Sequence, residues 1–384
     1  MHLEILYAKG VSEAARALGV APSTIRNWRS RGAVPERYLE AIEAMGRGEE
    51  ITPPVVLDPI PAGHHVKGVS TLVAADGSVS QQWIKTRAEE ESREAAIARL
   101  LRELPASVPA LPRGPTPEGP SRPDLVAVYP MGDPHVGMLA WKHETGASFD
   151  LEIAERLMLT AIRDLVQRGP RAETALLINL GDFFHFDNSA QKTTRGDHTL
   201  DVDGRVSKVL TVGFRIMYET VRYLLEHHES VIVDTRKGNH DEHTAICLAI
   251  GLAAYFRAEP RVTVTIPHTV RGYYRFGKCL IGTAHGDRGK MTDLGAIMAE
   301  ERAPEWGATT ERVWFCGHVH HSTVTELRGV RIETFRTLAA RDSWHAGQGY
   351  ISGRDMARIV FHREYGQISR EIACVQYLEA IGAA

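Results

Sequence analysis

Five short motifs in this chain carry Asp, Asn or His, and each directly follows an apolar run of the kind that forms a buried strand. The clearest is Leu180-Gly181-Asp182, which follows the apolar residues 175–178. Open α/β sheets bind their ligands beyond the carboxyl ends of the strands, so these side chains are expected to meet at one edge of a sheet. The other four motifs are Asp133-Pro-His135, Gly238-Asn239-His240-Asp241, His285-Gly-Asp287 and Gly317-His318-Val-His320.

Imidazole and carboxylate groups together suit Mn, Fe or Zn, whereas an all-oxygen set suits Mg or Ca. Two such ions about 3.5–4 Å apart clamp a phosphate for in-line attack, and one carboxylate must then bridge them. A single His after an apolar strand is more often a structural residue than a ligand. Five motifs in the same setting favour a metal centre that acts on phosphate esters.

The ordered series of motifs resembles the calcineurin-like metallophosphoesterase superfamily over residues 125 to about 340. The resemblance implies a four-layer α/β/β/α sandwich for residues 125–384, with the metals at the strand ends. It also implies two ions, each with three ligands, and a bridging carboxylate. The implied ligands are Asp133, His135 and His320 for one ion, Asn239, His285 and His318 for the other, and Asp182 between them. His240 matches the catalytic histidine of the family, which protonates the leaving oxygen or stabilises the transition state.

The segment Gly181-Asp182-Phe-Phe-His185 departs from the Gly-Asp-x-x-Asp-Arg-Gly of Ser/Thr protein phosphatases. It is more similar to the exonuclease subunit of double-strand-break repair complexes, in which a histidine follows the bridging aspartate at this spacing. His185 is therefore a candidate catalytic residue that touches the scissile phosphate. The alternative is that His185 supports a metal ligand from behind. The layout of the whole chain also resembles phage or prophage metallophosphoesterases.

Residues 1–46 are predicted to form a small all-α helix-turn-helix domain. Residues 13–18 and 24–29 are expected helices, with Ser12 as the cap of the first and Gly32 as the stop of the second. The pattern is similar to phage and bacterial regulator-type DNA-binding domains. The candidate DNA-contacting residues on the second helix are Ser23, Thr24, Arg26, Asn27 and Arg29. The alternative is a helical module that binds protein or only packs.

Residues 47–124 are predicted to connect the two domains. They contain Pro-rich linkers, a β-hairpin at about residues 66–85 and a charged helix at about residues 87–104. From residue 125 strands and helices alternate, as in α/β proteins. Asp150 is expected to cap an amphipathic helix that ends at Arg168, and further helices are expected over residues 206–228 and 241–256.

The composition is that of a cytoplasmic globular protein. The formal net charge is −3, so any basic surface for nucleic acid must be local. The four cysteines are widely spaced and indicate reduced thiols, not a disulfide framework. The start, Met1-His2-Leu3-Glu4, has no signal-peptide pattern, and no apolar run is long enough to span a membrane. The expected partners are DNA and, through residues 47–124 or the catalytic domain, a second copy of the chain.

The leading hypothesis is a two-metal phosphodiesterase that acts on DNA as an exonuclease-like nuclease, with Mn²⁺ as the preferred ion and Fe, Zn or Ni as alternatives. One alternative is a phosphoesterase for small molecules or cyclic nucleotides that the N-terminal domain recruits to DNA or protein. Another is a DNA-binding regulator with a vestigial phosphoesterase fold. Several polar residues could shape the cleft or only form surface contacts: Asp287, Arg288, Arg341, Asp342 and His345, with Lys192 and Arg195 as candidate phosphate contacts.

Overall fold

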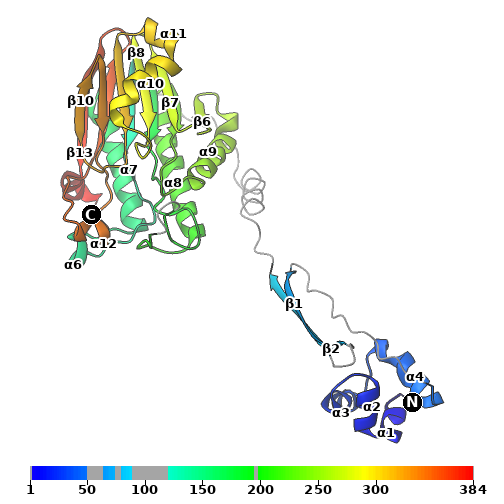
Figure 1. Ribbon diagram of the computed structural model, residues 1–384. Helices are drawn as coiled ribbons and strands as arrows, with labels where there is room; N and C mark the ends of the chain where they lie inside the picture. The colour runs from blue at the N-terminus through cyan, green and yellow to red at the C-terminus, as the bar shows by residue number, and fades with distance from the viewer. Residues whose placement is uncertain (1, 50–63, 74–78, 89–119, 194–197, 384) are drawn as a thin grey trace. The chain divides into compact units, whose positions relative to one another are not determined.

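The computed structural model describes residues 2–49, 64–73, 79–88, 120–193 and 198–383 (Figure 1). The chain divides into two units, Met1–Ser92 and Arg93–Ala384. The predicted linkers and most of the predicted charged helix at residues 87–104 lie outside the described residues. No helix in the described part of the chain is both long enough and apolar enough to cross a membrane.

The N-terminal helical domain consists of short helices around an apolar core. Its elements are α1 (His2–Ala8), α2 (Val11–Ala17), α3 (Pro22–Arg31), the 3-10 helix η1 (Glu36–Tyr38) and α4 (Leu39–Arg47). Pro22 occupies the first turn of α3, and Gly32 ends this helix with a left-handed φ of 69°. The prediction for Ser12 was wrong, because Gly10 is the N-cap of α2 and no side chain caps it.

The predicted hairpin is present in the same unit. Strands β1 (His64–Val73) and β2 (Val79–Ala88) pair in antiparallel fashion, from His64 opposite Ala88 to Val73 opposite Val79.

The second unit contains two sheets and is called here the catalytic unit, after the role that the sequence analysis predicts for its motifs. The larger has the strand order β13-β12-β3-β4-β5-β6. Its strands are β3 (Arg122–Met131), β4 (Ala172–Asn179), β5 (Ser230–Thr235), β6 (Val262–Thr265), β12 (Asp355–His362) and β13 (Gly366–Cys374). Strands β3 to β6 are parallel, so their carboxyl ends lie at one edge, whereas β12 runs antiparallel to both β3 and β13.

The smaller sheet has the order β10-β11-β9-β8-β7. Its strands are β7 (Arg271–Phe276), β8 (Cys279–Ala284), β9 (Glu311–Cys316), β10 (Thr323–Leu327) and β11 (Val330–Thr334). The central strands β8, β9 and β11 are parallel, and the edge strands β7 and β10 are antiparallel to their neighbours.

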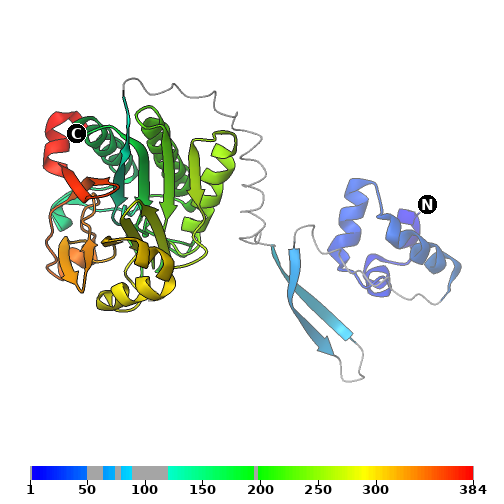
Figure 2. The same cartoon turned by 90° about the horizontal axis from the view of Figure 1, so that it is seen from above.

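Alternation along the strands shows how the layers stack. In β3, Val126 and Val128 pack into the core between the two sheets, where they join Ile281 and Phe315 of the smaller sheet. The residues between them in β3 face the helices on the outer side of the larger sheet. In β9, Trp314 likewise faces the helices outside the smaller sheet. Since strand side chains alternate between faces, the catalytic unit has the order helices, sheet, sheet, helices (Figure 2).

Helices α7 (Leu151–Arg168), α8 (Val206–Leu225) and α9 (Thr244–Tyr255) cover the larger sheet, and α10 (Leu294–Glu301) covers the smaller one. The Asp150 carboxylate accepts a hydrogen bond from the Ile153 N–H at 2.8 Å, so the predicted cap of α7 is confirmed. The short elements are α6 (Lys142–Thr145), α11 (Ala303–Ala308), α12 (Ser343–Gly347), α13 (Val375–Leu378), η2 (Phe256–Ala258), η3 (Met291–Asp293) and the π-helix η4 (Glu379–Ala383).

Candidate metal centre

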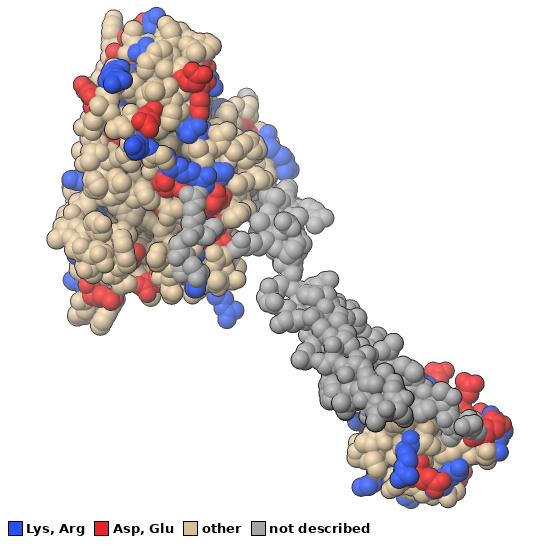
Figure 3. Space-filling model, in the orientation of Figure 1, with Lys and Arg blue, Asp and Glu red and all other residues tan. Residues whose placement is uncertain are grey.

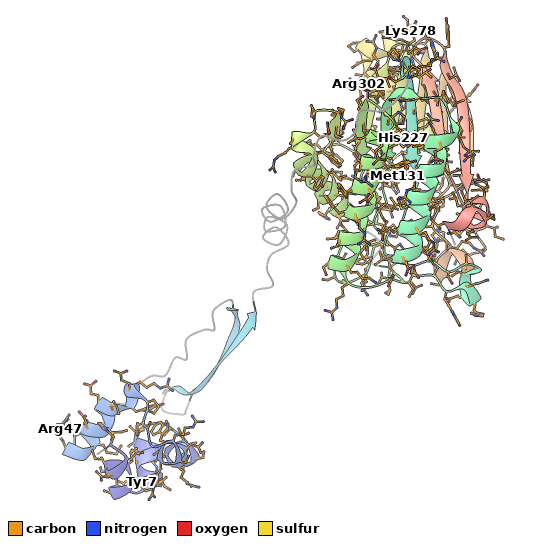
Figure 4. All side chains as sticks on the ribbon, turned by 180° about the vertical axis from the view of Figure 1, so that it is seen from behind. Tyr7, Arg47, Met131, His227, Lys278 and Arg302 are labelled. Atoms are coloured by element: carbon orange, nitrogen blue, oxygen red, sulfur yellow. The ribbon has the colours of Figure 1, made fainter. Side chains whose placement is uncertain are left out.

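The five predicted motifs lie in loops that follow parallel strands of the two sheets. Asp133 follows β3, Asp182 follows β4, and Asn239 follows β5 of the larger sheet. From the smaller sheet, His285 follows β8, and the segment that contains His318 and His320 follows β9. In Figure 4, Lys278 marks the turn that precedes β8 and Met131 marks the carboxyl end of β3, which is the end that carries the motifs.

Asp133, His135 and His320 form a first group of side chains that could hold one ion. Their ligand atoms all lie within 4.8 Å of one another. The Nε2 atoms of His135 and His320 are 3.1 Å apart, and His320 Nε2 is 3.6 Å from Asp133 Oδ1. The Asp133 carboxylate also accepts the His318 N–H at 2.8 and 2.9 Å, which ties the loop after β3 to the loop after β9.

Asp182, His285 and His318 form a second such group, again within 4.8 Å of one another. His285 Nε2 lies 3.2 Å from Asp182 Oδ2 and 3.1 Å from Asn239 Oδ1. His285 Nδ1 lies 3.0 Å from the Leu180 carbonyl, so a proton on Nδ1 leaves Nε2 as the ligand atom. The structure therefore brings all seven predicted metal ligands into two adjoining groups.

The separations between these atoms fit ligands of a divalent ion. Two nitrogens that each lie about 2.1 Å from one ion are roughly 3.0–3.4 Å apart at tetrahedral or octahedral angles. The two Nε2 atoms of His135 and His320 have this spacing, as do His285 Nε2 and its oxygen neighbours on Asp182 and Asn239. The nitrogen and oxygen donors are of the type that Mn, Fe and Zn accept.

Burial and mutual charge set the protonation of the ligand groups. Burial raises the pKa of Asp182, but His285 and other nearby histidines outweigh it and hold that pKa well below its usual range. Burial and the neighbouring His320 and His240 lower the pKa of His135. Asp182 is therefore a carboxylate and His135 a neutral imidazole at neutral pH, which are the forms that bind a cation.

His285 behaves differently, because burial lowers its pKa but the Asp182 carboxylate, followed by Asp133, raises it to about 10. A proton on His285 and a bound cation would therefore compete for the negative charge of Asp182 and Asp133.

His240 lies beside the two groups with its ring held at one nitrogen. Its backbone N–H donates to Asp182 Oδ1 at 2.8 Å, and its Nδ1 lies 2.8 Å from the His185 carbonyl oxygen. The His240 ring contacts the His135 ring edge-on, with centroids 5.0 Å apart. With Nδ1 engaged by a carbonyl, Nε2 is the nitrogen that can exchange a proton with a bound molecule.

His185 is buried behind His135. Their Nδ1 atoms are 3.1 Å apart, and the His185 ring stacks on the ring of His240. Burial and the neighbouring His240 lower the pKa of His185 to about 3, so it stays neutral. This arrangement fits the supporting role considered above, in which His185 would orient His135.

Asp241 has a role that the sequence analysis did not assign. Its carboxylate accepts hydrogen bonds from the backbone N–H groups of Gly238 at 2.8 Å, Asp182 at 3.1 Å, Phe183 at 2.8 Å and Phe184 at 3.3 Å. Burial, followed by the negative charge of Asp182, raises the pKa of Asp241 to about 7. Asp241 thus fastens the loop after β4 to the loop after β5. Its place in the motif with Asn239 and His240 was the available signal.

The backbone at the ligands is unusual. Seven described residues other than Gly have a positive φ, and five of them are Asp133, His135, Asp182, His318 and His320. Their φ angles lie between 45° and 72°. Asp and His adopt this left-handed conformation more readily than most residues, and strained backbone of this kind concentrates at functional sites.

Glycines allow the loops to approach one another. A Cβ at Gly238 would lie 1.9 Å from Asp182 Oδ1, and one at Gly317 would lie 2.7 Å from Asp133 Oδ2. Both motif glycines are therefore needed for the carboxylates to reach their positions.

The other candidate residues are dispersed. Asp342 and His345 lie beside the centre, since the His345 ring stacks on His320 with centroids 5.0 Å apart. Arg288 pairs with Glu242 at 2.6 Å. Arg195 lies outside the described residues. In the N-terminal helical domain, the candidate DNA contacts are exposed apart from the half-buried Thr24: Ser23, Arg26, Asn27 and Arg29.

A cavity of about 540 Å³ lies away from the candidate ligands, between β5 of the larger sheet and β7 and β8 of the smaller one. Its lining includes a buried Asp234–Arg236 ion pair and Thr283, whose hydroxyl donates to Asp234 at 2.6 Å. The Thr283–Asp234 hydrogen bond links β8 to β5, and so connects the two sheets at this point.

No protein-family model and no curated protein sequence matches the chain. Among solved structures, it is similar to a predicted phosphoesterase from Streptococcus pneumoniae, at 12% identity over 65% of this chain and 98% of that one, with a TM-score of 0.27. An archaeal phosphodiesterase is 13% identical over 65% and 99%, with a TM-score of 0.33. Vps29 from Entamoeba histolytica, solved with Zn²⁺, is 13% identical over 65% and 98%, with a TM-score of 0.27. Likenesses of this strength do not establish a family.

The fold and the site together define a class of protein on their own geometry. The catalytic unit is a mixed α/β unit of two facing sheets. The carboxyl ends of their parallel strands bring Asp, Asn and His side chains together in an arrangement that fits divalent cations.

Proposed function

We propose that this protein is a metallophosphoesterase that hydrolyses phosphodiester bonds with two divalent ions, and that its substrate is DNA. The observation that carries the proposal is the pair of adjoining ligand groups, one around Asp133 and the other around His285. Asp182 belongs to the second group, yet its charge also acts on His135 and His320 of the first. Its carboxylate is therefore the best candidate for a bridge between the two ions.

In this proposal His135, His320 and Asp133 hold one ion, and His285, His318 and Asn239 hold the other. Bound divalent ions supply Lewis-acid polarisation of the phosphoryl oxygens and a nucleophile at neutral pH. Asp241 keeps the loops after β4 and β5 in register through its four amide contacts. The buried, neutral His185 keeps the His135 ring in place.

His240 is proposed as the acid that protonates the leaving oxygen. The His185 carbonyl oxygen contacts Nδ1 of His240, and the Asp182 carboxylate accepts a hydrogen bond from the His240 backbone N–H. The ring and the backbone of His240 are therefore both held in place. A fixed ring delivers its Nε2 proton to one place beside the ligand groups. A positioned acid contributes about 10²- to 10⁴-fold to a rate.

DNA is proposed as the substrate because helix α3 of the N-terminal helical domain exposes three cationic side chains, Arg26, Arg29 and Arg31. Contacts between such side chains and phosphates bring nucleic acid to a protein without regard to sequence. On the face shown in Figure 3, basic and acidic side chains are interspersed on both units, so attraction to DNA must come from local groups of this kind.

The test is a cleavage assay on linear duplex DNA, single-stranded DNA and bis(p-nitrophenyl) phosphate, with Mn²⁺, Mg²⁺, Zn²⁺ or chelator. We expect Mn²⁺-dependent cleavage that falls by about 10²- to 10⁴-fold in His240→Ala. His268→Ala is the matched control, since His268 is exposed and lines the separate cavity.

Unchanged cleavage by His240→Ala would reject the role given to this residue. Turnover of the small diester without cleavage of either DNA would instead identify a small-molecule phosphoesterase. Failure on all three substrates with every metal would refute the proposed activity.

A further inference from the structure

A series of aromatic rings runs from the candidate metal centre to the protein surface. The ring of the candidate ligand His320 stacks on His345, with centroids 5.0 Å apart and planes at 24°. His345 contacts Trp344 at 5.0 Å and Tyr350 at 5.9 Å. Trp344 and Tyr350 stack on one another at 5.7 Å and 29°. Two of these contacts are close to parallel, which is the geometry of stacked rings.

The outer rings are unusually exposed for their size. Trp344 is 58% exposed, Tyr350 57%, and the adjoining Ile351 86%. Large apolar side chains that are clustered on a surface mark a site of interaction, whereas single exposed ones need no explanation. His345 and His320 connect this cluster to the candidate metal centre. A molecule that binds the cluster is therefore expected to take part in the proposed reaction.

Polar contacts beneath the rings hold the segment in place. The Asp342 carboxylate accepts the His345 N–H and lies 2.7 Å from His345 Nδ1. Arg341 donates to the Thr145 carbonyl of α6 at 2.9 Å and to the Tyr350 carbonyl at 3.1 Å. Figure 1 shows α12 and α6 as neighbours at the same end of the unit. The rings are therefore carried on an anchored segment.

We propose that Trp344 and Tyr350 form a stacking platform for a nucleobase of the substrate whose phosphodiester lies at the metal centre. This inference rests on the proposed function and narrows its substrate to nucleotides with an unpaired base, as in single-stranded DNA or a frayed duplex end. Stacking of a base on an aromatic side chain contributes about 1–3 kcal/mol and tolerates any sequence, because every base has a planar face.

The exposed rings could also hold a protein segment, but the structure favours a base. The platform continues the ring series that begins at a candidate metal ligand, since His345 contacts both His320 and Trp344 with centroids 5.0 Å apart. A planar ring can extend the near-parallel stack of Trp344 and Tyr350, whereas an aliphatic segment cannot.

The test uses two diesters that share a leaving group, of which only the first carries a nucleoside and hence a base: thymidine 5′-(p-nitrophenyl phosphate) and methyl p-nitrophenyl phosphate. In Trp344→Ala and in Tyr350→Ala we expect KM for the thymidine ester to rise by about 5- to 100-fold, with kcat retained. KM for the methyl ester should not change. An equal rise for both esters would overturn the platform.

Tyr365→Ala is the matched control. Tyr365 is 74% exposed and stacks on His362 at 4.5 Å, so it too is an exposed, stacked ring. It follows the end of β12 that pairs with the start of β3, and therefore lies at the end of the sheet away from Asp133. Its substitution should leave both KM values unchanged.

A second measurement needs no turnover. Oligothymidylate added to the metal-free protein should quench tryptophan fluorescence, and an abasic oligomer of the same length should not. Trp344→Phe should remove the quenching while it keeps the fold. Equal quenching by both oligomers, or quenching that persists in Trp344→Phe, would reject base stacking at this site. Absence of turnover on both esters with every metal, together with base-specific quenching, would reject the proposed catalysis and leave the platform standing.

Discussion

The two units of this protein differ in the polarity of the side chains that they bury. Among residues 2–49, the buried side chains are all apolar or aromatic: Leu6, Ala14, Ala15, Leu18, Ile25, Trp28, Tyr38, Ile42 and Met45. The catalytic unit buries Asp, His, Glu and Arg side chains, among them the wholly buried Asp133 and Asp241. Burial of a charge is costly unless partners compensate for it.

This difference indicates which side chains of each unit are available to bind a ligand. In the catalytic unit the buried charges are held at strand ends, where a cation would complete their compensation. The core of the N-terminal helical domain contains only apolar and aromatic side chains, so its exposed side chains are the ones available to a ligand. A single substitution should therefore have a large effect at the metal centre and a small one on the surface of α3.

The largest effect is expected from Asp182→Asn. The amide keeps the size of the side chain and an oxygen for the His240 N–H, but it removes the charge that His285 and the cations require. Loss of such a ligand should cost several kcal/mol of transition-state stabilisation, or roughly three or more orders of magnitude in diester turnover.

Thermal melting separates this loss from a loss of fold. Mn²⁺ should raise the Tm of the wild type, because a ligand that binds only the folded state stabilises it, and should not raise the Tm of Asp182→Asn. Asp293→Asn, an exposed substitution, should behave as the wild type. A variant at residue 182 with wild-type turnover would contradict the metal centre.

An intermediate effect is expected for the buried His228 in the core of the catalytic unit. Its Nε2 is 3.0 Å from the Tyr129 hydroxyl and its Nδ1 2.8 Å from the Ala172 carbonyl. Burial lowers its pKa from 6.5 to about 4. Between these values the unfolded chain binds a proton that the folded chain does not, so stability is complete above pH 6.5 and falls as the pH drops toward 4.

The expected loss is about 3 kcal/mol in the free energy of unfolding over this range. Urea unfolding at pH 7 and pH 4.5 should show a smaller pH effect in His228→Gln than in the wild type or in His227→Gln, a half-buried neighbour. The N-terminal helical domain, with no buried ionisable His, Asp or Glu in its described part, should change little. An equal pH effect in all three proteins would show that His228 does not control it.

The smallest effect is expected from Arg26→Ala on α3. Loss of one phosphate contact should weaken DNA binding by roughly tenfold or less at low salt. It should also lower the number of counterions released on binding by about one, which is measured as a shallower dependence of affinity on salt concentration. Turnover of the small diester should not change.

Arg47→Ala is the control, since Arg47 is an exposed arginine that pairs with Glu49 at the end of α4 (Figure 4). If both variants bind DNA as the wild type does, α3 is not the contact surface.

Much of the fold was predictable because its signals are local. Asp150 caps α7, and the helix is amphipathic as predicted, with Leu151, Leu157 and Leu165 among its buried residues. Convergence of the five motifs was predictable because parallel strands place their carboxyl ends together, whereas the choice of seven candidate ligands within the motifs came from the resemblance to the metallophosphoesterase superfamily. Helix α1 was missed because it is short and carries no cap signal before it, and the edge strands β10 and β13 were missed because their apolar alternation is weak.

Other features depend on contacts between distant residues, and no local pattern encodes them. The hydrogen bonds that Asp241 accepts from the N–H groups of residues 182–184 and the contact between His185 and His135 arise only when the loops after β3, β4 and β5 meet. The proposed platform at Trp344 connects to the candidate centre through His345, whose ring stacks on His320 from another loop. The role of α3 in DNA binding stays a prediction, because exposure of Arg26 shows only that it is accessible.

The left-handed backbone at five of the candidate ligands limits how the candidate metal centre can be re-engineered. Glu and Cys are obvious replacements when ion preference is to be altered, yet most residues resist this conformation, at a cost of about 1–3 kcal/mol per position. The residue types that suit this conformation at positions 133, 135, 182, 318 and 320 are Asp, Asn, His and Gly. A library that aims at a new ion should therefore vary the neighbours of these loops and leave the coordinating positions alone.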